Sequence, residues 1–500
     1  MSKIIKKIRV MQQGGTFSSD IPIGAEASNV ITEDGDSVQD KIDIMNLGKI
    51  NCYDSISSIS EDVDIGEVFM LKDYDTIFIT TNTATISSLQ ISSNRYADII
   101  SKRVIIDSLG ITTIINPTLF TEIVSYACSK GIELVFAKKI YTLQQTITLT
   151  NVDQLKLSGL DNRSEILYTG NDYAFIINKM QNGILSNFKI NCNGSNSGIY
   201  FKYSSSTSEI VSSSLCKINI NNAKNAIKSD CYMNHVNFEN CSFIISGSNG
   251  TNIDFSEALY PDFITINNCL IKSNGSTNNG IHINNGTMIN ITNNEIIGFK
   301  YGFYMIATNN TKDVNNINIL QNSFKDISDT AFYINSNNSG VYIVNNLIIR
   351  DCLVQSATLT IDYGIFISNV HNLILDNINI EQDSTHQIWL SNCVDSRVGM
   401  INCWYNSVTQ ANNQIDGTNI QYEYINYQKK YTVPANGSVN VQLGSTHNLI
   451  NFDNYIINQV GSDNSTNNLT VSNYSNTSGK ITFTLANLSS AAIDVLIQAF

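Results

Sequence analysis

The feature that most constrains this chain is a phrase of alternating apolar residues ending in asparagine, which recurs between residues 185 and 403. Typical copies are Phe238-Glu239-Asn240-Cys241 and Ile266-Asn267-Asn268-Cys269. Alternation within a repeat of roughly 26 residues predicts a solenoid of short parallel strands. Asparagine tolerates the left-handed backbone conformation, so it suits a turn between strands. The register asparagines that we take as one column are Asn240, Asn268, Asn294, Asn322, Asn346, Asn377 and Asn402.

The sequence around this repeat divides the 500 residues into four segments. We expect an all-β protein built on a parallel β-helix of about eleven coils. The helix predicted over residues 116–131 has Asn116 as its cap and Pro117 in its first position, and it would cover the apolar end of the first coil. The segments are residues 1–50 with a short helix, a small β-rich domain at 51–115, the capping helix plus β-helix at 116–425, and a C-terminal β-sandwich at 426–500.

Composition excludes several classes of function. The formal net charge is −13, which argues against binding nucleic acid or an anionic membrane surface. No run of about 18 apolar residues exists, so we expect no membrane insertion. The sequence has ten cysteines but no CxxC pair, and none of its five histidines has zinc-ligand spacing to them, so we expect no metal and no cofactor. The cysteines after the register asparagines fit stacked apolar core positions, with a disulfide between coils as the alternative. Stacked thiols would indicate assembly in a reducing cytoplasm.

Two stretches of the chain resemble phage tail proteins of the pectate-lyase-like superfamily. Residues 89–100 are similar to the strand before the β-helix, and residues 120–143 to the entry helix and first coil. The usual acidic lead and the turn proline and glycine of that entry are missing. Residues 22–35 are similar to virion-anchoring segments of phages that infect low-GC Gram-positive hosts.

This resemblance implies a right-handed β-helix with one end attached to the virion. It implies a place in the phage tail, contact with tail or baseplate proteins through residues 1–50, and often a homotrimer. The implied ligand is a host-surface polysaccharide. Pectate-lyase chemistry also needs acidic calcium ligands, and no matching aspartate cluster is present in the sequence.

One group of charged residues could carry catalysis. Counting four residues past the register asparagine places Asp326, Arg350 and Glu381 on three successive coils. At a strand spacing of about 4.8 Å the two carboxyls would lie about 10 Å apart, close to the separation in inverting glycosidases. The alternative interpretation is an exposed ladder of alternating charge.

Aromatic residues near the end of the predicted solenoid are candidate sugar-binding groups, because sugars place their C–H faces on aromatic rings. These residues are Trp389, Trp404 and Tyr405, with core packing as the alternative. The acidic stretch at residues 254–262 is interpreted as a solvated loop, with calcium binding as a lesser possibility.

Three functions remain open from sequence. The first is a phage receptor-binding protein that attaches to cell-surface glycan, and this is the interpretation that we favour. The second is a glycan depolymerase that uses carboxylates on the same solenoid. The third is a structural appendage in which the β-helix is a spacer and residues 426–500 recognise the host.

Overall fold

The computed structural model describes most of the chain between residues 51 and 499. The described residues are 10–11, 17–18, 51–54, 56–59, 64–71, 76–83, 85–93, 95–275, 277–307, 314–336, 344–355, 361–381, 384–405, 414–422, 425–443, 455–460, 469–477, 480–488 and 493–499. They fall into two compact units, one of residues 1–112 with 132–134 and one of residues 113–131 with 135–500. The short helix predicted within residues 1–50 lies outside the described residues, where only the strand pair β1 (Val10–Met11) and β2 (Phe17–Ser18) is described.

The first unit contains one five-stranded sheet. Its order is β3-β4-β5-β7-β6, with β3 and β4 parallel and the other neighbours antiparallel. Phe69 and Phe78 stack at its centre with ring centroids 5.3 Å apart, and both are fully buried. The bounds of the strands in this unit are β3 (Asn51–Tyr53), β4 (Val68–Leu71), β5 (Ile77–Thr81), β6 (Gln90–Ser92), β7 (Arg95–Ile99) and β8 (Arg103–Ile105).

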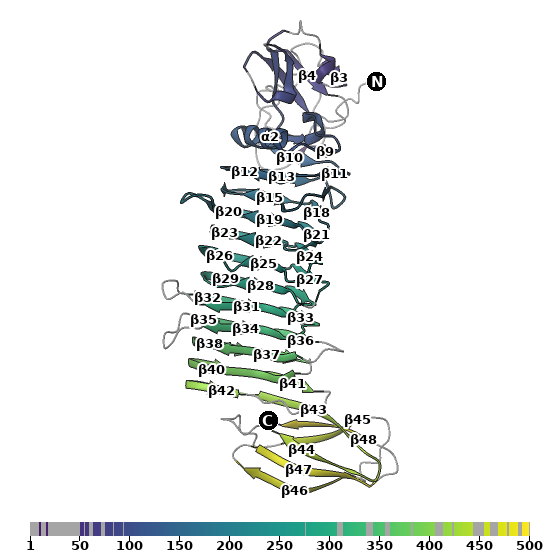
Figure 1. Ribbon diagram of the computed structural model, residues 1–500, viewed down its shortest axis with the longest axis vertical. Helices are drawn as coiled ribbons and strands as arrows, with labels where there is room; N and C mark the ends of the chain where they lie inside the picture. The colour runs from purple at the N-terminus through teal and green to yellow at the C-terminus, as the bar shows by residue number, and fades with distance from the viewer. Residues whose placement is uncertain are drawn as a thin grey trace. The chain divides into compact units, whose positions relative to one another are not determined.

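The second unit is a parallel β-solenoid, which confirms the predicted architecture (Figure 1). It has about nine turns that each contain three separate strands, fewer than the eleven coils predicted. The count differs because the turns at both ends are incomplete: β10 (Glu133–Phe136) and β11 (Ile140–Leu143) precede the nine, and in the next turn two strands merge into β40 (Ser384–Val398). The last solenoid strands are β41 (Ile401–Tyr405), β42 (Gln414–Tyr422) and β43 (Ile425–Val433).

Each turn supplies a first, a second and a third strand, and each strand pairs in parallel with its counterpart in the next turn. The first strands are β12 (Ile147–Leu149), β15 (Tyr173–Ile177), β19 (Ser197–Phe201), β22 (Ile227–Ser229), β25 (Thr251–Phe255), β28 (Asn279–Ile283), β31 (Tyr301–Ala307), β34 (Thr330–Ser336) and β37 (Ile361–Ser368). The second strands are β13 (Lys156–Gly159), β16 (Met180–Gln181) with β17 (Ile184–Ser186), β20 (Glu209–Cys216), β23 (Tyr232–Glu239), β26 (Tyr260–Asn267), β29 (Gly286–Thr292), β32 (Val314–Leu320), β35 (Val344–Arg350) and β38 (Val370–Asp376). The third strands are β14 (Glu165–Tyr168), β18 (Lys189–Asn191), β21 (Asn219–Ala223), β24 (Ser242–Ile245), β27 (Leu270–Ser273), β30 (Glu295–Ile297), β33 (Ser323–Lys325), β36 (Leu353–Gln355) and β39 (Ile378–Ile380).

The interior of the solenoid is filled by columns of apolar side chains that come into register from turn to turn. Ile253, Ile281, Phe303, Phe332 and Ile365 form one such column, and every member is fully buried. Burying a side chain of this size contributes about 1.5–3 kcal/mol. Because of the alternating pattern, each strand contributes one apolar residue to each such column, where that residue stacks on its counterpart one turn away.

The turn between second and third strands carries a column of residues in the left-handed conformation. Its members are Asn187, Lys217, Asn240, Asn268, Asn293, Gln321, Asp351 and Asn377, with φ between 49° and 57°. From Asn187 to Asp351, each N–H donates to the carbonyl that ends the second strand of the next turn, as Asn268 N does to Thr292 O at 3.1 Å. The expected asparagine ladder exists in part, because Asn268 Nδ2 donates to Asn240 Oδ1 at 2.5 Å.

The register that we assigned from sequence is wrong at four of its seven positions. Asn294 and Asn322 follow the left-handed residue by one and point into the core. Asn346 belongs to a second left-handed column within the second strands. Asn402 lies in β41, where it pairs with Asn379. The error arises because asparagine fills the left-handed site, the buried site beside it and exposed strand sites alike.

Asn294 and Asn322 form a buried amide pair in a column that other turns fill with cysteine. Asn322 Oδ1 accepts from the backbone N of Asn294 at 2.9 Å, and Asn322 Nδ2 donates to the Ile291 carbonyl at 2.8 Å. Cys241 and Cys269 occupy the same column in the two preceding turns and are buried as free thiols. The prediction that these two cysteines are stacked core residues is confirmed. Cys403 lies in β41, and its side chain is outside the described part.

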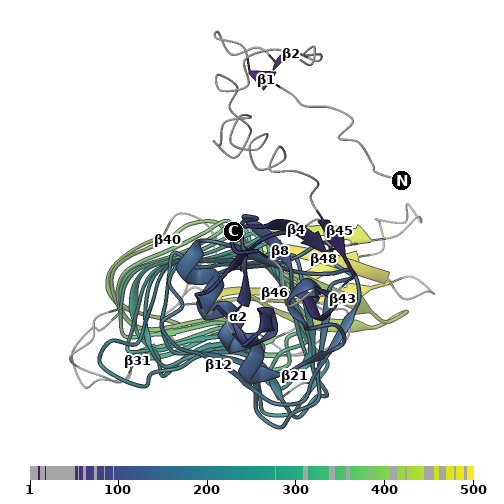
Figure 2. The same cartoon turned by 90° about the horizontal axis from the view of Figure 1, so that it is seen from above.

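Helix α2 (Pro117–Lys130) has the predicted caps and covers the start of the solenoid (Figure 2). The Asn116 side chain accepts from Leu119 N at 3.1 Å, and Gly131 closes the helix with φ 66°. The ring of Phe120 lies 6.0 Å from that of Phe136 and 6.3 Å from that of Phe175. In the described part of the chain, no helix is both long and apolar enough to cross a membrane.

The C-terminal strands form two antiparallel groups. β43, β48 (Ile493–Ala499) and β45 (Tyr455–Val460) pair at the end of the third-strand sheet. β44 (Ser438–Leu443), β47 (Lys480–Asn487) and β46 (Leu469–Thr477) form a separate sheet. Both groups contribute fully or almost fully buried residues, among them Ile497 in the first and Phe483 in the second. A core supplied by two antiparallel sheets is typical of a β-sandwich.

Candidate functional site

The outward-facing positions of the first strands form one continuous row, which we call the outer row. Strand pairing places its members in register over eight successive turns. They are Tyr200, Lys228, Asp254, His282, Tyr304, Tyr333, Phe366 and Trp389. The row is polar at its N-terminal end and aromatic at its C-terminal end. Side chains from residues 28 or so apart in sequence therefore become neighbours about 4.8 Å apart.

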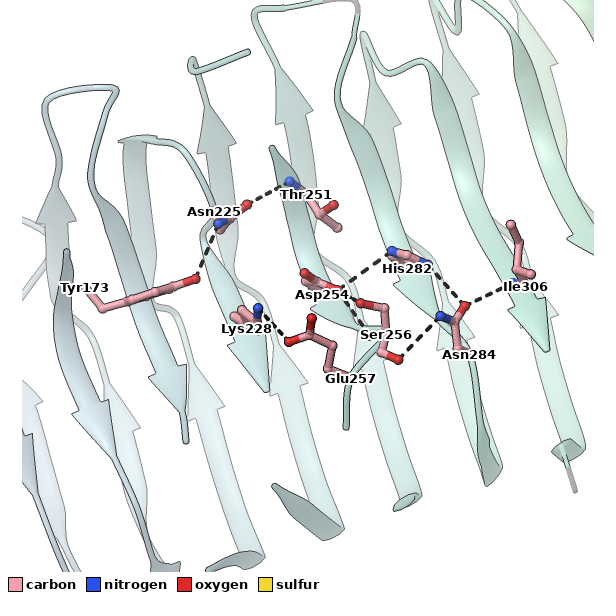
Figure 3. A network of polar contacts seen from close by, with 10 residues as sticks. All are labelled: Tyr173, Asn225, Lys228, Thr251, Asp254, Ser256, Glu257, His282, Asn284 and Ile306. Atoms are coloured by element: carbon pink, nitrogen blue, oxygen red, sulfur yellow. Dashed lines mark hydrogen bonds and ion pairs between the residues drawn. The ribbon is translucent and has the colours of Figure 1, made fainter. Parts of the chain in front are cut away.

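The polar half of the outer row is a hydrogen-bonded network that spans β22, β25 and β28 (Figure 3). Lys228 Nζ lies 2.8 Å from Glu257 Oε2, in the turn after β25. Asp254 Oδ1 accepts from the hydroxyl of Ser256 at 2.6 Å and faces His282 Nδ1 at 3.8 Å. The Asp254 and His282 side chains are only 16% and 17% exposed, whereas that of Glu257 is 63% exposed. One carboxylate of this turn is thus held in place while the other is open to solvent.

The hydrogen bonds around His282 identify its neutral tautomer. Asn284 Oδ1 accepts from Ile306 N at 3.0 Å, which orients the amide so that Oδ1 also faces His282 Nε2 at 3.1 Å. Nε2 must therefore carry the proton. Burial lowers the pKa of His282, and this outweighs the carboxylate of Asp254, which acts to raise it. In the neutral ring, Nδ1 is then an acceptor, and it lies 3.8 Å from the Asp254 carboxylate, a second acceptor.

The network continues into the preceding turns through tyrosines. Tyr200 Oη donates to Asp230 Oδ2 at 2.5 Å, and burial raises the pKa of Tyr200, with the Asp230 carboxylate adding to the effect. Tyr173 packs against Tyr200 with ring centroids 4.8 Å apart and planes tilted by 37°. The Oη of Tyr173 accepts from Asn225 Nδ2 at 3.4 Å. Burial is the largest single effect on the pKa of Lys228 and lowers it, but the hydrogen bond to Glu257 and the attraction of Glu257, Tyr173 and Asp254 together hold that pKa above its ordinary value.

The aromatic half of the outer row is a ladder of stacked rings. Tyr304 and Tyr333 lie 5.2 Å apart, and Tyr333 and Phe366 lie 4.8 Å apart with planes only 9° from parallel. Tyr301 and Tyr363, three residues earlier on their strands than Tyr304 and Phe366, pack beside them. Because the rings cover one another along the solenoid, most of their faces are used within the protein. The ladder stiffens this side of the solenoid and presents ring edges outward.

The residues predicted to be catalytic are not brought together as expected. Asp326 follows β33, and its N–H bonds to the Gln355 carbonyl of the next turn. Glu381 follows β39, and its N–H bonds to the Val354 carbonyl. Arg350 ends β35, on the other side of the left-handed turn, and its Nε lies 3.6 Å from Asp376 Oδ2. The stacking premise was wrong because it used the mistaken register, and a catalytic role for the three residues stays a prediction.

The three predicted ligand-binding aromatics lie in two different sheets. Trp389 ends the outer row and is half-buried, with its ring edge-on to Tyr363 at 5.9 Å and to His386 at 5.0 Å. Trp404 and Tyr405 lie in β41, where they pair with Gln428 and Lys429 of β43. The described part of the chain does not include the side chains of Trp404 and Tyr405, so their role stays a prediction.

Sequence reasoning missed the polar network as a site. We had interpreted residues 254–262 as a solvated loop, but Asp254 lies in β25 and Asp262 in β26. Lys228, Asp254 and His282 are separated by 26 and 28 residues, which is the repeat length itself. This spacing was the available signal, and it becomes visible only when outward positions are compared turn by turn. Among the described residues, no cluster of three or more histidine, cysteine or acidic side chains could hold a metal ion.

Comparison with known proteins gives matches among solved structures only. No family model and no curated protein matches the chain. A mutant tailspike of E. coli bacteriophage HK620, in complex with pentasaccharide, is 10% identical, with a TM-score of 0.45 over 84% of this chain and 97% of that chain. The chain is similar in fold to phage tailspikes. A second similar structure is the tailspike of Acinetobacter phage vB_ApiP_P1, which is 10% identical, with a TM-score of 0.45 over 90% of this chain and 98% of that chain. The tailspike of Acinetobacter baumannii bacteriophage Fri1, a capsular polysaccharide depolymerase, is 11% identical with a TM-score of 0.39 over 90% and 98%.

Proposed function

We propose that this chain is a phage tail spike, a receptor-binding protein that attaches the virion to a polysaccharide on the host cell surface. The observation that carries the proposal is the outer row, in which tyrosines, a lysine, an aspartate and a histidine follow one another on a ladder of strands, with the carboxylates of Asp230 and Glu257 bonded to members of the row. A linear polymer has repeated hydroxyl groups, and such a row offers repeated acceptors and donors along one line. The HK620 tailspike is in complex with pentasaccharide, a ligand of the same class.

The charge of the site favours binding of a polymer that is not itself strongly acidic. Asp230, Asp254 and Glu257 lie within two turns, and Lys228 is already paired with Glu257. A polyanion would meet like charge here, in a protein whose net charge is −13.

A second candidate function is cleavage of the same polysaccharide. The observation that favours it is the contrast between Asp254, which is held in a nearly buried network, and Glu257, which is open to solvent. Two carboxylates in different surroundings are what glycoside hydrolysis requires, since one acts as acid and the other as base or nucleophile. Asp326 and Glu381, predicted from sequence, are the competing pair.

The remaining parts of the proposal concern partners and host. Attachment to tail or baseplate proteins is assigned to residues 1–50, and the functional particle is taken to be a homotrimer in the virion tail, assembled in the host cytoplasm. A low-GC Gram-positive host is the expectation from residues 22–35, but the similar solved structures come from phages of E. coli and Acinetobacter and do not support it.

The decisive experiment measures binding of the full-length protein to an array of bacterial surface polysaccharides, with Glu257→Gln as the test variant. Glu295→Gln is the matched control, because Glu295 also pairs with a lysine, Lys325, but on the third-strand sheet. We expect Glu257→Gln to weaken binding at least about tenfold and Glu295→Gln to leave it unchanged. Equal binding by both variants would remove the Lys228–Glu257 part of the polar network from recognition, and no binding by the wild type would remove the proposed function.

Cleavage is tested on the polysaccharides that bind, by release of reducing ends. If the outer row is catalytic, Asp254→Asn and Glu257→Gln abolish release while Asp326→Asn and Glu381→Gln do not. The opposite pattern would restore the pair predicted from sequence. Binding without release by the wild type identifies the protein as a receptor-binding module alone.

A further inference from the structure

The second strands carry their own column of left-handed residues, one in each turn. Over eight turns its members are Ser212, His235, Phe263, Met288, Asn316, Asn346, Asn372 and Asp395, with φ between 49° and 58°. Serine, asparagine and aspartate are ordinary residues for this conformation, because their side chains are short and polar. His235, Phe263 and Met288 stand on three successive turns in the middle of the column, and we call them the ridge.

The ridge strains the backbone and contributes little burial of apolar surface to the stability of the fold. Histidine is enriched in this conformation, as asparagine and aspartate are, but Phe263 and Met288 are bulky residues for which positive φ is a genuine outlier. Phe263 is 38% exposed and Met288 is 42% exposed, so neither gains the burial that would repay the strain. Asparagine serves the same position in three other turns. Strained backbone that presents apolar side chains to solvent is a feature of binding sites.

At the N-terminal end of the ridge, one face of the His235 imidazole ring is not covered by another member of the column. The rings of His235 and Phe263 stack with centroids 4.3 Å apart and planes 11° from parallel. Phe263 therefore covers one face of the imidazole. The next member of the column on the other side is Ser212, whose side chain ends at its hydroxyl, so nothing from this column covers the second face of the His235 ring. Both His235 and Ser212 are exposed.

The surface beside the ridge is polar and lacks positive charge. Asn237, Thr265 and Asn290 stand two residues after the ridge members on their strands, in register with one another. Asn318 continues that line and donates to Asn290 at 2.8 Å. Strands β20, β23, β26 and β29 contain no lysine or arginine, and their carboxylates are Glu209, Glu239 and Asp262.

We propose that the face of the His235 imidazole that Phe263 leaves uncovered, on the side of Ser212, is a stacking subsite for one sugar ring of an uncharged polysaccharide. The negative face of the ring attracts the weakly positive C–H groups of a sugar. Phe263 is a positioning residue, because its stack fixes the orientation of the imidazole. The amides and hydroxyls alongside supply hydrogen bonds to sugar hydroxyls, and the carboxylates disfavour a ligand that carries uronic or sialic acid. This inference rests on the proposed function and assigns the class of sugar.

A second copy of the chain is the competing occupant of the ridge. If the same strands of two copies met here, Asp262 and Glu239 would leave water, and no lysine or arginine on these strands could pair with them. A single sugar ring, in contrast, covers His235 and leaves those carboxylates solvated. The size of the ridge, three side chains on three turns, also matches one sugar better than a protein surface.

The test uses the full chain and an array of bacterial surface polysaccharides sorted into neutral, amino-sugar and acidic sets. The variants are His235→Asn and Phe263→Asn, which place in the ridge the residue that the same column uses at Asn316. Because asparagine suits the left-handed conformation, we expect both variants to fold with an unfolding temperature equal to or above that of the wild type. The control is Ile140→Asn, which removes an exposed apolar side chain from the third-strand sheet; Ile140 is 55% exposed, against 38% for Phe263.

We expect the wild type to bind members of the neutral set, both ridge variants to lose at least about tenfold in affinity, and the control to bind as the wild type does. Unchanged affinity of the ridge variants would overturn the subsite while leaving the proposed function in place. Binding confined to acidic polysaccharides would overturn the sugar class, and a wild type that binds nothing would overturn the proposed function itself. A change of oligomeric mass in the ridge variants, with affinity intact, would identify the ridge as a contact between copies.

Discussion

Replacing Asn322 with alanine should destabilise the solenoid far more than replacing an asparagine on its surface. Asn322 is 1% exposed, and its side-chain oxygen accepts from both the backbone and the side-chain nitrogen of Asn294, at 2.9 and 3.0 Å. Its amide nitrogen donates to the carbonyls of Ile291 and Leu320. The Leu320 carbonyl keeps a second donor, Asn293 N, so the group that loses most is the Asn294 N–H.

The magnitude follows from these contacts. The orphaned buried N–H of Asn294 costs about 1–3 kcal/mol. The lost bonds to Asn294 Nδ2 and to the Ile291 carbonyl cost about 1 kcal/mol each, and the Leu320 carbonyl is not counted because it keeps a donor. Asn322→Ala should therefore cost about 3–5 kcal/mol in all. Asn322→Cys should cost less, about 1–2 kcal/mol, because a sulfur can accept the same N–H and the column already holds Cys269 and Cys352. Asn318→Ala removes one half-exposed bond to Asn290 and should cost about 0.5–1 kcal/mol.

The measurement is the unfolding rate in denaturant, since long β-solenoids are better compared by kinetics than by equilibrium. We expect the order Asn322→Ala fastest, then Asn322→Cys, then Asn318→Ala, with the wild type slowest. The double variant Asn294→Cys with Asn322→Cys extends the cysteine column and should unfold more slowly than Asn322→Ala. If Asn322→Ala unfolds no faster than Asn318→Ala, the buried amide pair does not stabilise the turn and the reasoning is refuted.

Two further predictions concern titratable groups. Burial lowers the pKa of His282, so the unfolded chain binds its proton more readily; stability from this group is complete above a pH of about 6.5 and is lost as the pH falls toward the folded pKa. The drop in unfolding temperature between pH 7.5 and 5.5 should therefore be smaller in His282→Gln than in the wild type, and an equal drop would contradict the assignment. Burial raises the pKa values of Cys192, Cys231 and Cys352 to about 12, so a thiol-alkylating reagent at neutral pH should modify exposed Cys52 quickly and these three only after denaturation, as mass spectrometry of the digested protein would show.

The sequence was sufficient for local structure and for the class of fold. The alternation of apolar residues predicts strands such as β23 and β26, and the repeat predicts that they stack. The cap at Asn116 and the stop at Gly131 give the helix its bounds, because capping depends on residues within a few positions of each other. These features are local, and local chemistry can be read directly along the chain.

The site depended on the structure, because contacts between turns depend on register and register depends on the turns. From one left-handed turn residue to the next, the chain uses between 23 and 30 residues, as from Lys217 to Asn240 and from Asn187 to Lys217. Counting from a mistaken asparagine placed Arg350 after the left-handed turn, beside Asp326 and Glu381. In the structure Arg350 lies before that turn, where it contacts Asp376. Backbone hydrogen bonds between parallel strands fix the true alignment, and only that alignment places Lys228, Asp254 and His282 side by side.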